Sequence, residues 1–431
     1  MGDDLLSYEQ AAELVACRAR DLAQRRPATE RVDLADAAGR ILAAAVAADD
    51  DQPPFARSTR DGYACRVAEA SAHLTLPVAG LTHAGEAPPA ALPAGKAWEI
   101  MTGAPVPAGA DCVVMLEYVE RVGDTIRLVS SRRIEARENI VAKGAQSRRG
   151  DVLLKPGTKM GAAQIALAAS CGYARLEVYV RPRVAILTTG DELVPVDATP
   201  GPGKIRNSNA PMLAALVAHA GGDPVILPTA ADTAEALDDA LELATQADIL
   251  LISGGVSAGK FDLVEPALAR LDSKIFFTGI RIQPGKPLVF GEIASSGLKP
   301  YINRPRSEGH FGPAPIPVFG LPGNPISSAA TFHLFAAPIL AALAGSNEIY
   351  PRFVLAELSQ ATDRKGRPGL TRFLPARCEF NASVNELPKV ALVPWHGSGD
   401  LTAFAQSNCF VVIPEDKGSL EAGSMVRILL H

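Results

Sequence analysis

The middle of the chain alternates short apolar runs with longer segments of helical periodicity, and this alternation restricts the fold more than any other feature. Strands and helices that alternate at this spacing form a parallel, doubly wound sheet. Ligands of such sheets bind at the carboxyl ends of the strands. We therefore expect an α/β domain, with strands at residues 184–187, 225–227 and 249–252 and helices at 209–220 and 233–245.

The apolar run at residues 249–252 is followed by a glycine-rich loop at 253–259 and then by Lys260 and Asp262. An unbroken apolar run is typical of a strand that is buried on both faces. Glycine lets backbone N–H groups approach a ligand, and such a loop before a helix is a common anion site. Lys260 could then contact a phosphate, and Asp262 a divalent cation. The alternative is an ordinary tight turn with a solvated lysine and an aspartate that caps the helix.

Other turns after predicted strands also carry polar residues. Asp191 and Glu192 follow the first of these strands, and Asp232 follows the second. Further along the chain, Lys286 and the Pro-Gly-Asn-Pro turn at 322–325 follow apolar runs in the same way. Because parallel strands end at one edge of the sheet, these turns should converge on one site.

Both flanks of this section differ from it in pattern. The first has a capping box that begins at Ser7, which predicts a helix to about Arg25, and a second helix is expected at 162–170. Short alternating runs predict a small β domain at 47–151, and strands at 353–358, 390–393, 409–413 and 425–430 predict a C-terminal β domain. The expected domains are 1–46 with 152–181, 47–151, 182–347 and 348–431, with a surface insert at 294–317.

Composition excludes several classes of protein. The net charge of −5 argues against a nucleic-acid binder. No apolar run approaches the roughly 20 residues of a membrane span, and the acidic start lacks a signal-peptide pattern. The six cysteines are scattered, which indicates neither a zinc site nor a disulfide framework. We expect a soluble cytoplasmic protein.

Two loops of the predicted small β domain are unusually polar. One contains Arg57, Arg60 and Asp61, and the other places Thr102 directly after an apolar strand end. The two arginines could bind phosphate oxygens, and their positive charge should keep Asp61 ionised. The alternatives are a solvated turn for the first loop and a hairpin corner for the second.

Six motifs occur together in order along the chain, and together they identify a family. They are Asp61-Gly62-Tyr63-Ala64, Met101-Thr102-Gly103-Ala104-Pro105, Thr189-Gly190-Asp191-Glu192-Leu193, Ser253-Gly254-Gly255-Val256-Ser257, Pro284-Gly285-Lys286-Pro287 and Leu321-Pro322-Gly323-Asn324-Pro325. Over nearly its whole length the chain resembles the molybdopterin molybdenumtransferases, the bacterial MoeA proteins related to the E domain of gephyrin.

The resemblance implies a fold and an activity. The fold is a doubly wound α/β molybdopterin-binding domain, flanked by an elongated helical and β domain, a small β domain and a C-terminal β-barrel-like domain. The activity is the insertion of molybdate into adenylated molybdopterin with release of AMP, and it depends on Mg²⁺. The expected assembly is a homodimer with its active site at the subunit interface, and other proteins of molybdenum cofactor biosynthesis are potential partners.

The resemblance also assigns roles to residues. Those expected to be catalytic are Asp61, Thr102, Glu192 and Lys286. Asp61 would orient one of its arginine neighbours toward molybdate or phosphate. The expected metal ligands are Asp232 and Asp262. The residues expected to bind the molybdopterin substrate are Ser253, Gly254, Gly255, Ser257, Gly259, Pro322, Gly323, Asn324 and Pro325.

The chain departs from the family pattern at Arg60, Glu99, Gln146 and Gln283, and the insert at 294–317 is longer than expected. Two alternatives to the transferase are a non-catalytic scaffold like gephyrin and a molybdopterin adenylyltransferase. The presence of Glu192, Asp232 and Asp262 favours catalysis over a scaffold. The adenylyltransferases resemble only the section around 182–331, so the flanking β domains argue against that class.

Overall fold

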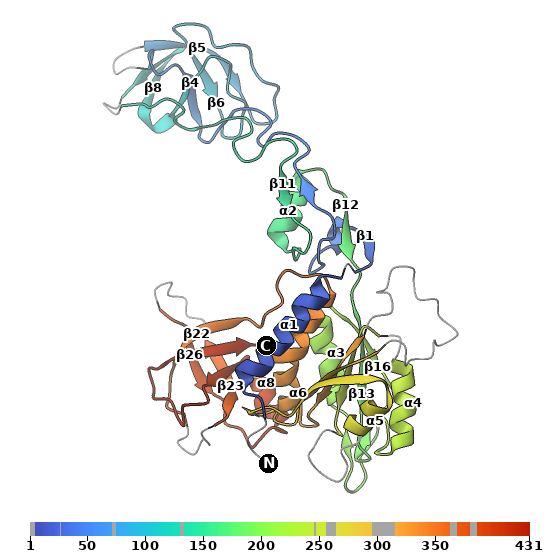
Figure 1. Ribbon diagram of the computed structural model, residues 1–431. Helices are drawn as coiled ribbons and strands as arrows, with labels where there is room; N and C mark the ends of the chain where they lie inside the picture. The colour runs from blue at the N-terminus through green and yellow to red at the C-terminus, as the bar shows by residue number, and fades with distance from the viewer. Residues whose placement is uncertain are drawn as a thin grey trace. The chain divides into compact units, whose positions relative to one another are not determined.

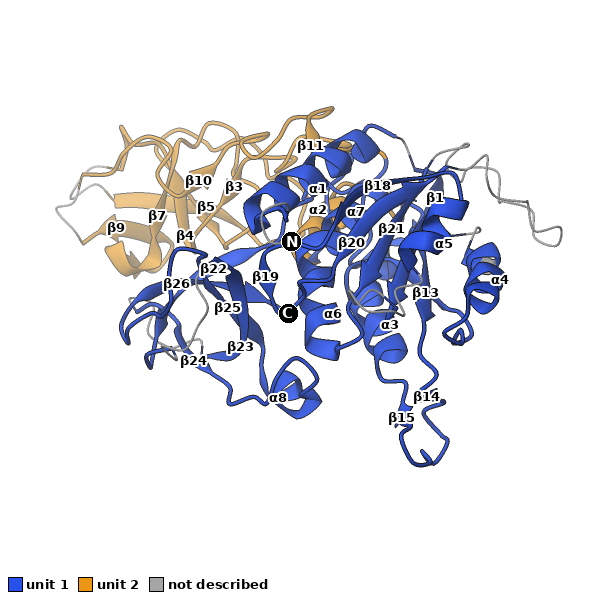
Figure 2. Cartoon of the chain, turned by 60° about the horizontal axis from the view of Figure 1, so that its bottom comes forward, with its two compact units in different colours: residues 1–43, 156–161, 175–431 blue, residues 44–155, 162–174 orange. Residues whose placement is uncertain are grey.

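A computed structural model describes residues 5–25, 27–70, 75–129, 133–244, 247–255, 264–294, 315–362, 369–379 and 386–431. The chain forms two compact units, which Figure 2 shows in separate colours. Unit 1 comprises residues 1–43, 156–161 and 175–431, and unit 2 comprises 44–155 and 162–174. The division into four domains stays a prediction.

A six-stranded sheet forms the centre of unit 1. Its strand order is β16 (Asp223–Ile226), β13 (Arg183–Thr188), β17 (Ile249–Ser253), β21 (Ile316–Leu321), β20 (Val289–Ile293) and β18 (Ser273–Thr278). The first four strands are parallel, as predicted. Strand β20, which lies beyond the section for which a parallel sheet was predicted, runs antiparallel to both of its neighbours. No helix separates β18 from β20, and a parallel return would need a longer crossover connection.

Helices cover both faces of this sheet (Figure 1). Side chains from alternate positions of β17 enter different cores: Ile249 and Leu251 pack in one, and Leu250 and Ile252 in the other. Burial on both faces explains the unbroken apolar run of this strand. The first core contains α1 (Tyr8–Ala23), α3 (Asn209–His219) and the helix formed by α6 (Pro325–Thr331), a π-helical turn (Phe332–Ala336) and α7 (Ala337–Leu343). The second contains α4 (Ala234–Ala244) and α5 (Val264–Arg270).

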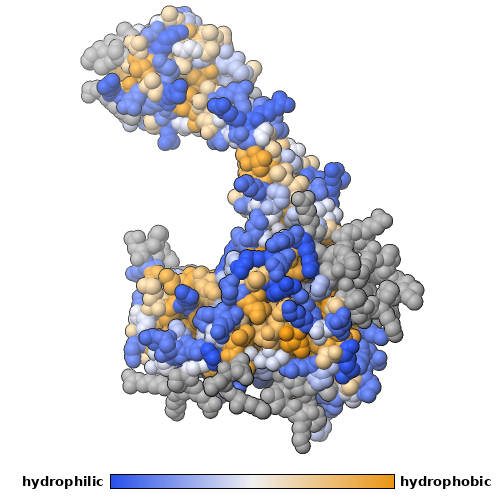
Figure 3. Space-filling model, in the orientation of Figure 1, coloured by the Kyte–Doolittle hydropathy of each residue, from blue (hydrophilic) through white to orange (hydrophobic). Residues whose placement is uncertain are grey.

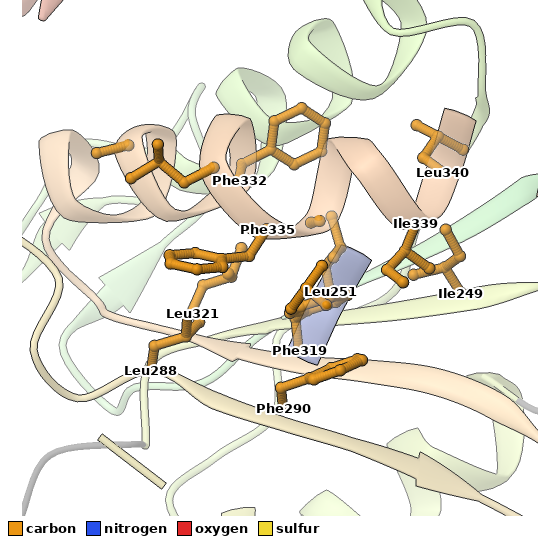
Figure 4. Packing of buried hydrophobic residues seen from close by; sticks show 14 of the residues in the cluster. Ile249, Leu251, Leu288, Phe290, Phe319, Leu321, Phe332, Phe335, Ile339 and Leu340 are labelled. Carbon is orange, nitrogen blue, oxygen red and sulfur yellow. The ribbon is translucent and has the colours of Figure 1, made fainter. Parts of the chain in front are cut away.

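The continuous helix Pro325–Leu343 is the apolar centre of unit 1. Phe335 and Ile339 point from this helix toward the sheet, where the rings of Phe290 and Phe319 stack 4.6 Å apart (Figure 4). The helix is long and apolar enough to span a membrane, but 83% of its apolar window is buried inside the protein. This burial identifies it as a core helix.

The N-terminal helix α1 (Tyr8–Ala23) begins with the predicted capping box, in which Ser7 and Gln10 bind each other's backbone N–H groups. Arg18 of this helix forms an ion pair with the buried Glu292 of β20, with 2.6 Å between Nη2 and Oε1.

Short strands complete this part of unit 1: β1 (Thr29–Asp33) pairs with β12 (Arg175–Tyr179), and β14 (Leu193–Val194) pairs with β15 (Ile205–Arg206). A 3₁₀ turn, Leu34–Asp36, follows β1.

The C-terminal part of unit 1 is a closed five-stranded barrel. Its strands are β22 (Phe353–Leu358), β23 (Thr371–Glu379), β24 (Lys389–Leu392), β25 (Cys409–Ile413) and β26 (Met425–Leu430), with β19 (Ile282–Gln283) added at β23 and α8 (Leu401–Gln406) before β25. Four strands agree with the prediction. Strand β23 was not predicted, since Pro375 lies in its middle. Hydrophobic side chains, including Leu355 and Met425, are exposed over β22 and β26 (Figure 3).

Unit 2 contains a second six-stranded sheet, which confirms the predicted small β fold. Its order is β7 (Cys112–Met115), β4 (Gly62–Cys65), β6 (Ala97–Ile100), β5 (Thr75–Thr82), β9 (Thr125–Leu128) and β8 (Val119–Val122). The remaining elements are β2 (Val46–Ala47), β3 (Arg57–Ser58), the 3₁₀ turn Leu116–Tyr118, β10 (Ile140–Val141), β11 (Val152–Leu154) and α2 (Ala162–Ser170). Cys65 and Cys112 are opposite each other on β4 and β7 as free thiols, with 3.5 Å between their Sγ atoms.

Candidate active-site cleft

The carboxyl ends of β13, β17 and β21 border one cleft in unit 1, with a volume of about 790 Å³. Its walls come from the turns after these strands, from the start of α3 and from Gly399 and Leu401 of the C-terminal part. The cleft brings together nine residues of the predicted site: Glu192, Asp232, Ser253, Gly254, Gly255, Pro322, Gly323, Asn324 and Pro325. Its position agrees with the rule that open parallel sheets bind ligands at this edge.

The glycine turn after β17 has a conformation that only glycine adopts easily. Gly254 has φ +102° and Gly255 has φ +66°. A Cβ atom on Gly254 would lie 2.5 Å from the carbonyl oxygen of Thr189, so any side chain would collide with the neighbouring turn. The turn after β21 is also close, because a Cβ on Gly323 would be 3.7 Å from the Gly254 Cα. Close packing of three backbone turns therefore determines the shape of this wall.

Asn209, at the start of α3, connects two of these turns. Its Nδ2 donates to Ser253 Oγ at 2.8 Å and to the Gly323 carbonyl oxygen at 2.6 Å. Ser253 is 2% exposed, and its hydroxyl also lies 3.4 Å from the Ser328 hydroxyl. The Ser253 side chain thus positions the turns. Sequence reasoning did not assign Asn209 to the site, because an asparagine at the start of a helix is common and indicates no ligand.

Two buried polar atoms in the walls of the cleft lack a partner among the described residues. They are Thr189 Oγ1, on a residue that is 7% exposed, and Asn209 Oδ1. A buried polar atom without a hydrogen bond costs about 1–3 kcal/mol. These atoms are therefore suited to hydrogen bonds with a polar ligand in the cleft.

Two aspartates at the edge of the cleft bind each other's backbone. The Asp191 N–H donates to Asp232 Oδ2 at 3.3 Å, and the Asp232 N–H donates to Asp191 Oδ1 at 3.2 Å. Each carboxylate keeps one oxygen to which no described backbone N–H donates. Thr233 caps α4 through its hydroxyl, so Asp232 does not have to serve as the cap. Glu192 lies beside this pair, and a Cβ on Gly190 would be 2.6 Å from its carboxylate.

These carboxylates are compatible with a magnesium ion. Within the described parts of the chain there is no group of three or more His, Cys, Asp or Glu side chains arranged to hold a metal. Mg²⁺ does not require one, because it commonly binds one or two carboxylates and takes its other ligands from water and substrate phosphates. The free oxygens of Asp191 and Asp232 satisfy this smaller requirement.

Unit 2 holds the other predicted pair, Asp61 and Thr102. The Thr102 backbone N–H and hydroxyl both donate to Asp61 Oδ1, at 2.6 and 2.8 Å. These two hydrogen bonds hold the pKa of Asp61 below its ordinary value of 3.8. The expectation that arginines would keep Asp61 ionised has the wrong cause, since Asp61 forms no ion pair with Arg57 or Arg60 in the described structure. Instead, the Nε atom of Arg57 is buried and lacks a hydrogen-bond partner among these residues.

Comparison with known proteins places the whole chain in one family. The family model described as "MoeA N-terminal region (domain I and II)" matches residues 6–172, "Probable molybdopterin binding domain" matches 185–342, and "MoeA C-terminal region (domain IV)" matches 358–431. A molybdopterin molybdenumtransferase of Nostoc sp. is 34% identical over 413 residues, which cover 93% of this chain and 88% of the relative. The chain belongs to the MoeA family.

Other MoeA-family relatives agree over the full length. The molybdopterin molybdenumtransferase of Haemophilus influenzae is 31% identical over 405 residues, covering 93% of each chain. Two crystal structures of molybdopterin biosynthesis MoeA protein from Pyrococcus horikoshii are also similar. One has a TM-score of 0.70 at 30% identity and covers 99% of both chains; the other has a TM-score of 0.76 at 28% identity, covering 99% of this chain and all of the other.

The remaining predicted residues of this MoeA-family chain lie elsewhere. Lys286 is exposed in the loop before β20, and its neighbour Pro287 lines the cleft. Ser257, Gly259 and Asp262 lie outside the described residues, as does most of the insert at 294–317. Of the departures from the family pattern, Glu99 forms an ion pair with Arg121, with 2.5 Å between Oε2 and Nη1.

Proposed function

We propose that this MoeA-family chain is a molybdopterin molybdenumtransferase that inserts molybdate into adenylated molybdopterin and releases AMP. The observation that carries the proposal is the cleft that combines the glycine turn at Gly254 and Gly255 with the carboxylates of Glu192 and Asp232. A substrate that contains a pyrophosphate needs backbone donors for its oxygens and a cation for its charge. The glycine turn of the cleft can supply the backbone donors, and its carboxylates can bind the cation.

The glycine turn would receive the phosphate groups of the substrate. Gly255 lines the cleft directly after Gly254, whose own N–H donates to the Leu321 carbonyl oxygen at 3.2 Å, and Gly323 approaches from the turn after β21. The unpartnered Asn209 Oδ1 and Thr189 Oγ1 would accept hydrogen bonds from N–H groups of the pterin or adenine. The predicted contacts of Pro322, Asn324 and Pro325 remain part of this proposal.

Asp232 would hold Mg²⁺ together with Asp191, and Asp262 is a further predicted ligand. The mutual backbone hydrogen bonds of Asp191 and Asp232 fix both carboxylates in advance, which lowers the cost of binding an ion. The bound ion would act as a Lewis acid on the phosphate oxygens. Glu192, which lines the same cleft, would orient the attacking water.

Cationic groups would bind the molybdate oxyanion. Lys286 is exposed and forms no ion pair within the described part of the chain. In unit 2, Arg57 has a buried Nε atom that finds no hydrogen-bond partner in the described part of the chain. The backbone N–H and the hydroxyl of Thr102 both donate to Asp61. We therefore propose that Thr102 positions Asp61 and does not itself contact molybdate.

We also propose that the chain is a cytoplasmic homodimer that works with other proteins of molybdenum cofactor biosynthesis. Helix α2 supports the dimer, because it is apolar yet only Ala168 among its residues is buried. Exposed apolar helices commonly mark protein interfaces. Sedimentation of the intact protein checks this: a stable monomer with full activity would remove the dimer from the proposal.

AMP release from adenylated molybdopterin, measured with Mg²⁺ and molybdate, tests the activity. Asp232→Asn should lower the rate at least about tenfold and raise the Mg²⁺ requirement, since it removes charge but keeps an acceptor for the Asp191 N–H. Asp223→Asn is the matched control, an exposed aspartate at the start of β16, and should retain the wild-type rate.

The same assay separates the alternatives. A scaffold without catalysis would release no AMP, whereas an adenylyltransferase would consume ATP and unmodified molybdopterin. An Asp232→Asn enzyme with the wild-type rate and Mg²⁺ dependence would refute the metal site but leave the transferase activity standing.

A further inference from the structure

Unit 1 contains a second cavity, with a volume of about 290 Å³, at the opposite edge of the central sheet. Its wall includes Arg181 and Gly221, which lie two residues before the starts of β13 and β16. These are the amino ends of parallel strands, whereas the active-site cleft lies at their carboxyl ends. The two cavities are therefore separated by the length of the sheet.

Positive charge predominates around this second cavity. Its wall contains Arg40, Lys159, Arg181 and Arg352, against the single carboxylate of Glu348. Arg352 is paired with Glu348, and Arg40 with Glu30. Lys159 and Arg181 are exposed and form no ion pair with any described residue. Two cations at the cavity thus remain uncompensated.

Two buried nitrogen atoms of the wall also lack hydrogen-bond partners in the described structure. One is Nε of Arg40, a residue that is only 9% exposed. The other is Nε2 of His333, in the π-helical turn. Burial, together with nearby His431 and His219, lowers the pKa of His333 to about 4, so its ring is neutral at pH 7. Buried polar atoms without partners normally indicate a missing ligand or solvent molecule.

The rest of the wall is apolar and built from small residues. Ala337, Pro338 and Ala341 of α7 face the cavity together with Leu429 of β26. Alanine side chains leave the space open, and the apolar surface favours a ligand with a compact hydrocarbon body. Ligand pockets in proteins typically have volumes of about 300–1,000 Å³, and this cavity is near the lower end of that range. Its volume therefore suits a molecule with a single ring.

We propose that this cavity binds a small organic anion with an aromatic or similarly compact apolar body. The anionic group pairs with Lys159 and Arg181, the apolar body lies against α7, and the buried nitrogens of Arg40 and His333 meet polar atoms of the ligand. Two helices connect this site to the active-site cleft. Helix α3 begins at the cleft with Asn209 and ends at the cavity with His219, and the helix Pro325–Leu343 also lines both.

Titration calorimetry of the full-length protein with phenyl phosphate tests the proposal. We expect saturable binding of one molecule per chain, with weaker binding of inorganic phosphate, which lacks the ring. In the Lys159→Gln, Arg181→Gln double variant, affinity should fall about tenfold for each lost charge. Both side chains are exposed, so the variant should fold normally, and its melting temperature verifies this.

Three controls make the result specific. Arg31→Gln removes an exposed cation from β1, outside the cavity, and should leave binding unchanged. Ala341→Leu fills the cavity without changing charge and should abolish binding. Excess AMP should not displace phenyl phosphate, because AMP, with a purine and a ribose, is larger than the single-ring ligand that this cavity accommodates.

Competition by AMP, or equal affinity in the wild type and the double variant, would refute the second site. Neither result depends on molybdenum insertion, so the proposed function and this inference can fail separately.

Discussion

The two groups of candidate site residues are built in different ways. In the cleft of unit 1, buried backbone turns determine the geometry: Ser253 is 2% exposed, and Gly254 has no room for a Cβ atom. In unit 2, Asp61 and Thr102 are both exposed, and two hydrogen bonds between loops define their arrangement. In the cleft, therefore, a change at the site is also a change to the core. In unit 2, a substitution at Asp61 or Thr102 can remove a functional group without disturbing the fold.

Gly254→Ala should have the largest effect and directly tests the rigidity of the cleft. The substitution imposes strain at φ +102° and a collision with the Thr189 carbonyl oxygen. We expect the free energy of unfolding to fall by about 3 kcal/mol or more, and the affinity for adenylated molybdopterin to fall at least about a hundredfold.

Gly203→Ala is the control for Gly254→Ala, because Gly203 has φ +73° but open space around its Cα. It should cost only about 1–2 kcal/mol of backbone strain. Urea unfolding and equilibrium binding measure both quantities. Equal losses in the two variants would show that the close approach to Thr189 is unimportant.

Asp61→Ala should show the opposite behaviour in unit 2. We expect molybdenum insertion to fall about a hundredfold, the range seen when one preorganised polar group is removed from an active site. The melting temperature and the affinity of the cleft for adenylated molybdopterin should stay unchanged, since Asp61 is exposed and lies in the other unit.

Asp124→Ala removes another exposed carboxylate of unit 2 and should leave insertion unaffected. A loss of substrate affinity in Asp61→Ala as large as in Gly254→Ala would contradict the separation of roles between the two groups of residues.

Mild acid should destabilise unit 1 through its buried histidines. Burial lowers the pKa of both His333 and His431 to about 4. The unfolded chain binds these protons near pH 6.5, so their contribution to stability is present above pH 6.5 and is lost as the pH falls toward 4. At pH 5.5 the loss should be roughly 1 kcal/mol for each histidine.

Tryptophan fluorescence can follow each unit separately during this titration. Trp395 lies in unit 1 and Trp98 in unit 2, so Trp98→Phe and Trp395→Phe each leave one reporter. Urea unfolding at pH 7.5 and 5.5 should shift more for the Trp395 signal. Equal stability of unit 1 at the two pH values would exclude the histidines as the cause.

Thr102→Ala should have the smallest effect, a change in the titration of one carboxylate. The variant loses the hydroxyl donor but keeps the backbone N–H donor, so the pKa of Asp61 should rise toward 3.8 without reaching it. The stabilisation from ionised Asp61 is present above pH 3.8 and is lost as the pH falls through its lowered pKa. NMR titration of the Asp61 carboxyl carbon measures the shift, and an unchanged pKa would show that the hydroxyl contributes nothing.

Much of unit 1 was predictable from local patterns. The run at β17 indicated burial on two faces, Ser7 and Gln10 indicated the start of α1, and the glycine turns indicated the ligand edge of the sheet. Each of these signals depends on residues a few positions apart, so periodicity and turn preferences are sufficient to recognise them.

Other features required partners that are distant in the sequence. The antiparallel direction of β20 and the inclusion of Pro375 in β23 follow from strand pairing. The donors to Asp61 come from a residue 41 positions away, where the sequence suggested the adjacent arginines. Asn209 had the pattern of an ordinary helix start until its contacts with Ser253 and Gly323 were known.

The sequence by itself determined most strands of the C-terminal part, the first strands of the central sheet, the start of α1 and the edge of the sheet at which the cleft lies, because local periodicity and turn chemistry encode them. Only the tertiary structure decided which polar groups meet. It paired Asp191 with Asp232, left the Thr189 hydroxyl without a partner among the described residues and opened the second cavity beside Arg40 and His333. The physical reason is that a hydrogen bond acts over about 3 Å, and the folded chain alone brings residues from distant positions within that distance.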